Sequence, residues 1–203
     1  MVGTPPPAAG ERQSLIEFIR LNQNAFFAAA YGLTDEQARS TPSVSTLSIG
    51  GLVKHAANVQ KGWVERAAVA PNFPPKDERP IEEIMAEYAD EHTMRDDETL
   101  EELLDKLRQQ NVETLRVLGE ADLDTPVPVP HEVPWFPKDV DHWSVRWVAL
   151  HLIEELTRHA GHADIIRESI DGATMYELMA ANEEWPETDW IKRWKPREDA
   201  TRG

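Results

Sequence analysis

The sequence predicts an all-α fold, a four-helix bundle with one long crossover connection, and three observations support this prediction. Four long stretches repeat apolar residues at the spacing of a helix face. No stretch shows a convincing strand pattern. A proline-rich connection over residues 123–143 separates the third helical stretch from the fourth, and its prolines exclude a continuous helix. With 203 residues, the chain is long enough for one domain with a substantial core.

The first long helix is expected over residues 11–31, with Gly32 as its stop. Its apolar residues recur at helical spacing: Leu15, Ile19, Phe26 and Ala30. Residues 1–10, rich in proline, alanine and glycine, are expected to form a flexible lead. After the helix, Thr34 begins a short helical turn that closes before Pro42.

The second long helix is expected over residues 49–69. Its apolar face includes Leu52, His55, Ala56, Val59 and Trp63. Three glycines, Gly50, Gly51 and Gly62, weaken this helix, because each costs up to ~1 kcal/mol relative to alanine. We attribute them to close contact with another helix.

A turn-rich connection over residues 70–80 leads to a short acidic helix, which has Pro80 in its first turn and ends near His92. The third long helix is expected from Asp96 to Leu118, with a leucine-rich apolar face and Gly119 as its stop. The proline-rich connection that follows is long for a compact domain. Loops of that kind commonly act as lids or walls of a site.

The fourth long helix is expected to run from the N-cap Ser144 to a stop at Gly172. At about 100° per residue, four polar side chains fall within an arc of roughly 80° on its apolar face. They are His151, Glu155, His159 and His162. Unpartnered polar groups on a buried face would cost several kcal/mol, so a bound metal ion is the simplest way to satisfy them.

A short helix over residues 174–182 and a tryptophan-rich tail are expected after the fourth long helix. The tail carries Trp185, Trp190 and Trp194, which are expected to pack across the bundle or between subunits. The expected organisation is a flexible lead (1–10), a bundle (11–180) and a tail (181–203). Apolar residues outside the main stripe, such as Leu150 and Ile165, lead us to expect a homodimer.

Composition and charge exclude several classes of protein. The net charge of −16 argues against nucleic acid and anionic membrane surfaces as partners. No apolar run reaches the roughly 20 residues of a membrane span, and the N-terminus lacks a signal-peptide pattern, so we expect a cytoplasmic protein. Because cysteine is absent, a catalytic thiol is excluded and any metal site must use histidine and carboxylate ligands.

The fourth long helix offers a pair of metal ligands on one face. Glu155 and His159 are four residues apart, so one oxygen and one nitrogen can reach a single ion. His55, the only histidine of the second helix, is the candidate third ligand from a facing helix. Three protein ligands leave a position for a metal-bound water or thiol, as in catalytic zinc sites. We expect His151 and His162 to orient the ligands or to touch substrate.

Each of these residues also has a simpler interpretation when it is taken alone. A lone histidine on an apolar face is more often a hydrogen-bonded core residue than a ligand. Glu155 alone is more often half of an ion pair, with Arg158 as its candidate partner. The remaining histidines are expected in loops or at helix ends without special chemistry: His92, His131 and His142.

Over residues 11–180 the chain resembles the DinB-like superfamily of metal-binding four-helix bundles. Two stretches, Thr41 to Trp63 (TPSVSTLSIGGLVKHAANVQKGW) and Ser144 to Gly172 (SVRWVALHLIEELTRHAGHADIIRESIDG), are similar to an actinobacterial branch related to mycothiol S-transferases. The superfamily places one histidine in the second helix and a ligand pair, often both histidine, in the fourth.

The ligand set in this chain departs from the all-histidine form of the superfamily. The combination of His55, Glu155 and His159 is instead similar to mycothiol-dependent maleylpyruvate isomerase, another member. Carried over position by position, these three residues are the ligands that the resemblance implies. An alternative set uses His162 in place of Glu155, which its spacing of three from His159 allows.

The resemblance implies a divalent metal that stabilises the thiolate of a small thiol, which is the competent nucleophile. Zinc is expected, with nickel, iron or manganese as alternatives. A thiol cosubstrate such as mycothiol, bacillithiol or glutathione would attack an epoxide, halide or activated alkene, a detoxification reaction. Two other hypotheses stay open: a non-catalytic metal-binding or dimerising bundle and, more weakly, a metal-dependent hydrolase.

Overall fold

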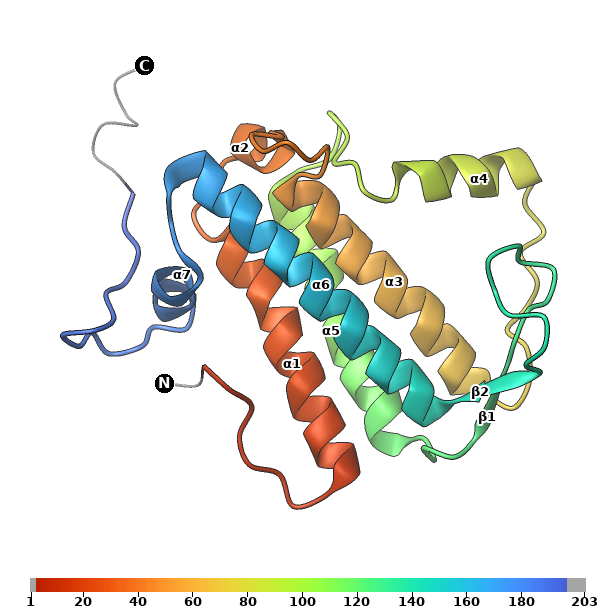
Figure 1. Ribbon diagram of the computed structural model, residues 1–203. Helices are drawn as coiled ribbons and strands as arrows, with labels where there is room; N and C mark the ends of the chain where they lie inside the picture. The colour runs from red at the N-terminus through yellow and green to blue at the C-terminus, as the bar shows by residue number, and fades with distance from the viewer. Residues whose placement is uncertain (1–2, 197–203) are drawn as a thin grey trace.

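Four long helices form a bundle in the computed structural model, which describes residues 3–196 (Figure 1). They are α1 (Glu11–Ala30), α3 (Ile49–Val69), α5 (Leu100–Glu120) and α6 (Val145–Asp171). Helix α3 packs against α5 and α6, and α1 packs against α6 and α5. The apolar faces meet in a core whose fully buried members include Ile19, Leu52, Leu107 and Leu152. The predicted all-α bundle is confirmed, and no helix of residues 3–196 is long and apolar enough to cross a membrane.

The bounds of α6 agree with the prediction from the sequence. The Ser144 side chain accepts a hydrogen bond from the Trp147 backbone N–H, so Ser144 is the N-cap. Gly172 ends the helix in the left-handed conformation, with φ of 75°, which a residue without Cβ adopts freely. These two caps place the whole row of polar residues within one uninterrupted helix.

The bounds of α5 differ from the prediction. The helix begins at Leu100 because Thr99 is its N-cap and forms a capping box with Glu102, so Asp96 lies outside it. Gly119 does not stop the helix, which continues to Glu120. The connection before α5 is therefore longer than the sequence indicated.

A small antiparallel sheet within the proline-rich connection corrects the expectation of no strands. Its strands are β1 (Pro126–Pro128) and β2 (His142–Ser144), and Val127 pairs with Trp143 at their centre. Two of the three residues of β1, Pro126 and Pro128, have no backbone N–H to donate to the partner strand, which keeps the sheet small. The sheet leads directly into α6, so it sets where that helix begins.

Helix α4 (Ile81–Asp90) stands apart from the bundle (Figure 1), and none of its residues is buried. The sequence predicted a helix reaching about His92, but α4 ends at Asp90. Glu91 and His92 therefore lie in the connection to α5, where they pack against α3.

The remaining helices are α2 (Asp35–Arg39) and α7 (Met175–Asn182), and α7 packs against α1. After α7, Trp185 is buried, and the Trp194 ring lies 4.8 Å from the guanidinium of Arg167. Trp190 is 94 % exposed. Two of the three tail tryptophans thus contact the rest of the chain, while the division into lead, bundle and tail stays a prediction.

Candidate metal centre

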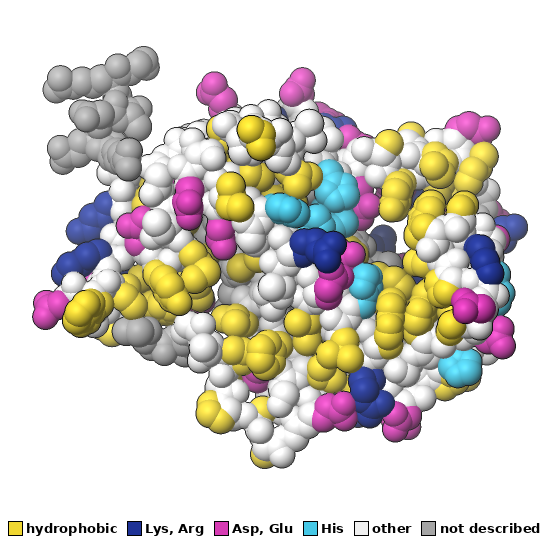
Figure 2. Space-filling view, viewed as in Figure 1, with side chains coloured by type: hydrophobic (Ala, Val, Ile, Leu, Met, Phe, Trp, Pro, Cys, Tyr) yellow, Lys and Arg dark blue, Asp and Glu magenta, His cyan; other side chains and the backbone are white. Residues whose placement is uncertain are grey.

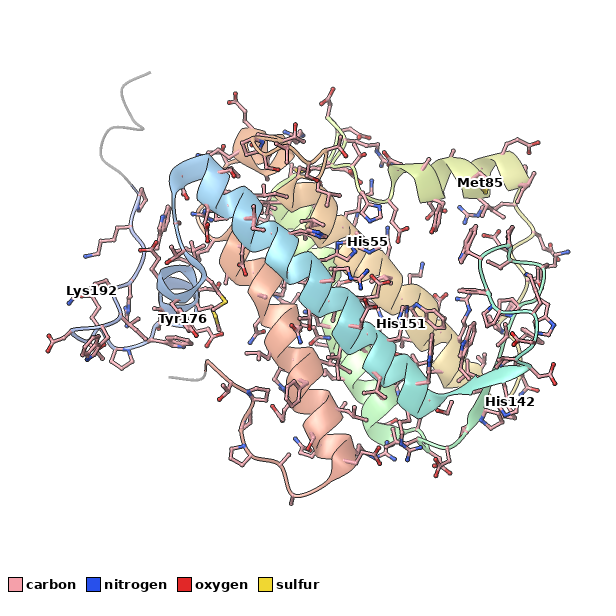
Figure 3. The ribbon with its side chains drawn as sticks, in the orientation of Figure 1. His55, Met85, His142, His151, Tyr176 and Lys192 are labelled. Carbon is pink, nitrogen blue, oxygen red and sulfur yellow. The ribbon has the colours of Figure 1, made fainter. Side chains whose placement is uncertain are left out.

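The three predicted ligands lie together between α3 and α6. His55 projects from α3, and its Nε2 lies 3.8 Å from Oε2 of Glu155 on α6. The same Oε2 lies 3.4 Å from Nε2 of His159, and the rings of His55 and His159 are 4.5 Å apart at their centroids. Figure 3 shows His55 and His151 along the line where the two helices meet. The structure therefore brings two imidazoles and one carboxylate to one point, as the spacing on α6 predicted.

Several imidazole nitrogens at this point lie near carboxylate oxygens without making a hydrogen bond of good geometry. His55 is 7 % exposed, and neither of its ring nitrogens has a partner with hydrogen-bond geometry within the described residues. Nδ1 of His159 is buried and unpartnered in the same part of the chain. Buried polar atoms without partners are costly. Neutral imidazole nitrogens and a carboxylate are ligands that zinc and similar divalent cations accept, so the donor set fits such an ion.

The charges of the site are strongly coupled. Burial by itself lowers the pKa of His55, but the nearby carboxylates of Glu155 and Glu91 outweigh it and raise that pKa to about 9. The imidazoles of His159 and His55 lower the pKa of the Glu155 carboxyl, against the effect of burial. Without a cation, the pocket therefore holds an ionised carboxylate against a protonated imidazole. A bound cation takes the place of that proton.

Two residues after α4 belong to the same cluster. Glu91 Oε1 lies 3.2 Å from His55 Nδ1, and the His92 ring stacks on the His55 ring with centroids 4.0 Å apart and planes at 22°. His55, His92 and His159 can each offer a ring nitrogen, all within 4.8 Å of one another. The prediction that His92 lies in a loop is right, and the structure places this histidine next to His55, a neighbour that the sequence did not indicate.

A glycine pair was the signal that could have found this segment. A Cβ on Gly51 would lie 2.7 Å from the backbone carbonyl carbon of His92, and one on Gly50 would lie 2.9 Å from Cβ of Met94. These glycines do mark a close approach, as predicted, but the neighbour is the segment after α4 and not a helix. A Cβ on Gly62 would make only an ordinary contact, 3.6 Å from the end of the Arg66 side chain, so close approach of another segment does not explain this glycine.

The other histidines occupy different places. His151 Nε2 lies 3.8 Å from Oε1 of Glu155, so His151 borders the cluster. The His162 ring lies 5.4 Å from that of His159, and its Nδ1 is buried without a partner among the described residues. Glu155 is within ion-pair distance of His55, which favours it over His162 as the third ligand. His131 and His142 lie on exposed parts of the proline-rich connection.

A row of aromatic rings continues from the cluster along α6. Trp143, Trp147 and His151 are four residues apart, and both successive pairs stack with centroids 5.0 Å apart. The Trp63 ring of α3 meets His151 edge-on at 4.8 Å. A cavity of about 720 Å³ opens at the far end of the row, lined by Phe136, Val140, His142, Trp143 and Trp147. The site therefore has an apolar wall on one side (Figure 2).

Comparisons with known proteins identify a family and a similar fold. A family model described as Mycothiol-S-transferase matches residues 14–172. A search of curated proteins finds no match. A solved structure, a conserved protein from Enterococcus faecalis, superposes with a TM-score of 0.55 at 16 % identity and covers 82 % of this chain and 100 % of that one. At that identity the likeness supports the fold alone.

Proposed function

Because this chain belongs to the mycothiol-S-transferase family, we propose that it transfers the sulfur of a small thiol to an electrophile. The reaction would use a divalent cation held by His55, Glu155 and His159. The observation that carries the proposal is the convergence of these side chains with buried, unpartnered imidazole nitrogens. The thiol is mycothiol or a chemically related cosubstrate. Zinc is the cation that best suits two imidazoles and one carboxylate, and nickel, iron and manganese are alternatives.

The reaction follows from what the chain supplies and what it lacks. A bound cation would stabilise the thiol as its thiolate, and the chain has no cysteine, so the sulfur comes from the cosubstrate. The thiol loses its proton to solvent, and a sulfur lone pair forms the new bond to carbon. With a halide, the carbon–halogen bond breaks and its electron pair leaves with the halide. With an epoxide, the carbon–oxygen bond breaks and the oxygen keeps the pair and takes a proton from solvent. With an activated alkene, the π bond breaks, its electron pair goes to the far carbon, and that carbon takes a proton from solvent. His55, Glu155 and His159 orient the attacking atom during this step.

The aromatic wall gives the electrophile a place to bind. Trp147 is 37 % exposed and stacks on His151, which borders the ligand cluster. An apolar electrophile lying against these rings would be next to His151, at the border of the ligand cluster. Burial of apolar surface contributes about 25 cal/mol per Å², so a flat apolar molecule gains most from this wall.

Thiol conjugation with the metal-free and metal-loaded protein tests the proposal. The zinc-loaded protein is expected to conjugate mycothiol, bacillithiol or glutathione to 1-chloro-2,4-dinitrobenzene, and the chelated protein is not. His159→Ala is expected to lose both the metal and the activity, while His131→Ala, which changes an exposed histidine that does not line the cavity, retains both. Full activity in a verified metal-free preparation would rule the proposal out.

A dimer-forming bundle without turnover is the second candidate, and exposed apolar residues favour it. Leu150 and Ile165 on α6 are 51 % and 61 % exposed. Under this hypothesis, Leu150→Glu dissociates a homodimer in sedimentation experiments and His159→Ala has no functional consequence. Conjugation activity that depends on His159 decides against it.

A further inference from the structure

We propose that His92 is a fourth, exchangeable protein ligand of the cation, which holds the vacant coordination position until the thiol takes it. The inference rests on the proposed function, because it requires a cation at His55, Glu155 and His159. It adds a residue from outside the two helices that carry those ligands. It also assigns a role to the segment between α4 and α5.

The distances place His92 within reach of the same ion. Ring nitrogens of His55, His92 and His159 lie within 4.8 Å of one another, a separation that one cation between them can bridge after small side-chain movements. The His92 and His55 rings are stacked at 22°, so both cannot point to one ion as they stand. Ligation therefore requires the His92 ring to turn about its side-chain bonds. His92 is only half-buried, which leaves room for that turn.

The backbone of His92 is held so that only the side chain needs to move. Gly51 lets the His92 carbonyl lie against α3, where a side chain at position 51 would collide with it. Lys54, one turn further along α3, binds Asp90 Oδ2 at 2.8 Å and Glu98 Oε2 at 3.1 Å. These two carboxylates lie on either side of His92 in the chain, so one lysine fastens both ends of the segment.

Further contacts strengthen the same attachment. The Arg95 guanidinium lies 3.0 Å from Asp90 Oδ2, and the side chain of Met94, in the same segment, is only 4 % exposed and lies against Gly50 of α3. By contrast, α4 itself has no buried residue. The interactions that hold this region are thus concentrated around His92, which is the expected arrangement for a segment that must present one side chain accurately.

An exchangeable ligand also fits the reaction. Three fixed ligands leave one position that the thiol must occupy. A neutral imidazole binds a divalent cation more weakly than a thiolate does, so His92 can occupy that position at rest and yield to the thiol. The simpler alternative is that His92 only stacks on His55 and positions it.

Cobalt binding to the full-length protein separates ligation from stacking. His92→Phe retains a flat ring over His55 but removes both nitrogens, and His92→Ala removes the ring as well. His142→Ala is the matched control, because it removes an exposed histidine that lies in β2. Visible absorption of bound Co²⁺ reports the number and type of ligands. Zn²⁺ affinity is measured in parallel by competition with a chelator, and thermal unfolding checks that each variant is folded.

We expect the Phe and Ala variants to share an altered Co²⁺ spectrum and a Zn²⁺ affinity about 10-fold lower than that of the parent. After addition of N-acetylcysteine, the spectra of the parent and His92→Phe should coincide, because His92 has then left the ion. A Co²⁺ spectrum of His92→Phe identical to that of the parent overturns the proposal, as does a loss of Zn²⁺ affinity that occurs only in His92→Ala. If the parent and His92→Phe spectra still differ after N-acetylcysteine is added, His92 does not give up its position to the thiol, and that part of the proposal is overturned. A parent protein that binds no Co²⁺ or Zn²⁺ refutes the proposed function instead.

Discussion

Replacing Gly51 by alanine is expected to destabilise the protein, although Gly→Ala in a helix usually stabilises. Gly51 lies in the first turn of α3, and no unusual φ forbids a side chain there. Its added methyl would collide with the His92 carbonyl oxygen and would lie 2.7 Å from the carbonyl carbon and 3.1 Å from Ser48 Oγ. Carbon atoms normally pack at about 3.5–4.0 Å, so the His92 backbone must shift by more than about 1 Å.

The size of the effect follows from two opposing contributions. Overpacking a close contact typically costs about 1–3 kcal/mol. The gain in helix propensity from glycine to alanine is at most about 1 kcal/mol. Because the neighbour is backbone held by Lys54, it yields poorly, and a net loss of about 1–2 kcal/mol is expected.

Urea unfolding followed by circular dichroism measures this loss, and Gly62→Ala is the matched control in the same helix. A Cβ at Gly62 meets only the Arg66 side chain, at 3.6 Å, so that variant should be up to about 1 kcal/mol more stable. Gly51→Ala should also weaken Zn²⁺ binding, because it displaces His92, whereas Gly62→Ala should not. Equal stabilisation by both substitutions would refute the close-approach explanation.

Three further predictions follow from charged side chains that are not themselves proposed ligands. Glu91→Gln should lower the pKa of His55 below about 9 in the metal-free protein, because the substitution removes one of the two carboxylates that raise that pKa. An NMR titration of the His55 imidazole that is the same in the parent and the variant would contradict this prediction. Burial, and then Glu168, raise the pKa of Asp164 to about 6, so this group makes folding less favourable as pH rises from about 4 through 6. A shift of that size corresponds to about 3 kcal/mol for a fully buried group, and solvent screening reduces it at the half-buried Asp164. Asp164→Asn should therefore stabilise by about 1–2 kcal/mol at pH 8 and by almost nothing at pH 3.5 in urea titrations, and a pH-independent effect would count against it. Arg167→Met should lower the free energy of unfolding by about 3–5 kcal/mol. The buried guanidinium donates to two backbone carbonyls at the end of α1 and pairs with the Asp171 carboxylate. A loss below about 1 kcal/mol in urea unfolding would show that these interactions are dispensable.

The bundle and the core of the site could be predicted because both depend on helix geometry. The apolar spacing and the caps Ser144 and Gly172 define α6, and a separation of four residues places Glu155 and His159 on one face. His55 is on the apolar face of a helix that packs against α6. No knowledge of loop paths was needed for any of these steps.

The contribution of the segment after α4 could not be predicted, because nothing periodic determines its path. Its position depends on Lys54 bridging two carboxylates that are eight residues apart and on the space left by Gly51. The glycine alone indicated a close approach without identifying the partner. The paired strands were missed for a related reason, since prolines make residues 126–128 look unsuited to a sheet.

Metal content of the purified protein tests the central proposal most directly. Protein incubated with Zn²⁺, freed of unbound ion by gel filtration and measured by elemental analysis should retain one zinc per chain, and His159→Ala should retain none. A parent chain that emerges without metal, or a His159→Ala variant that keeps a full equivalent, would contradict the assignment of this cluster as a metal centre.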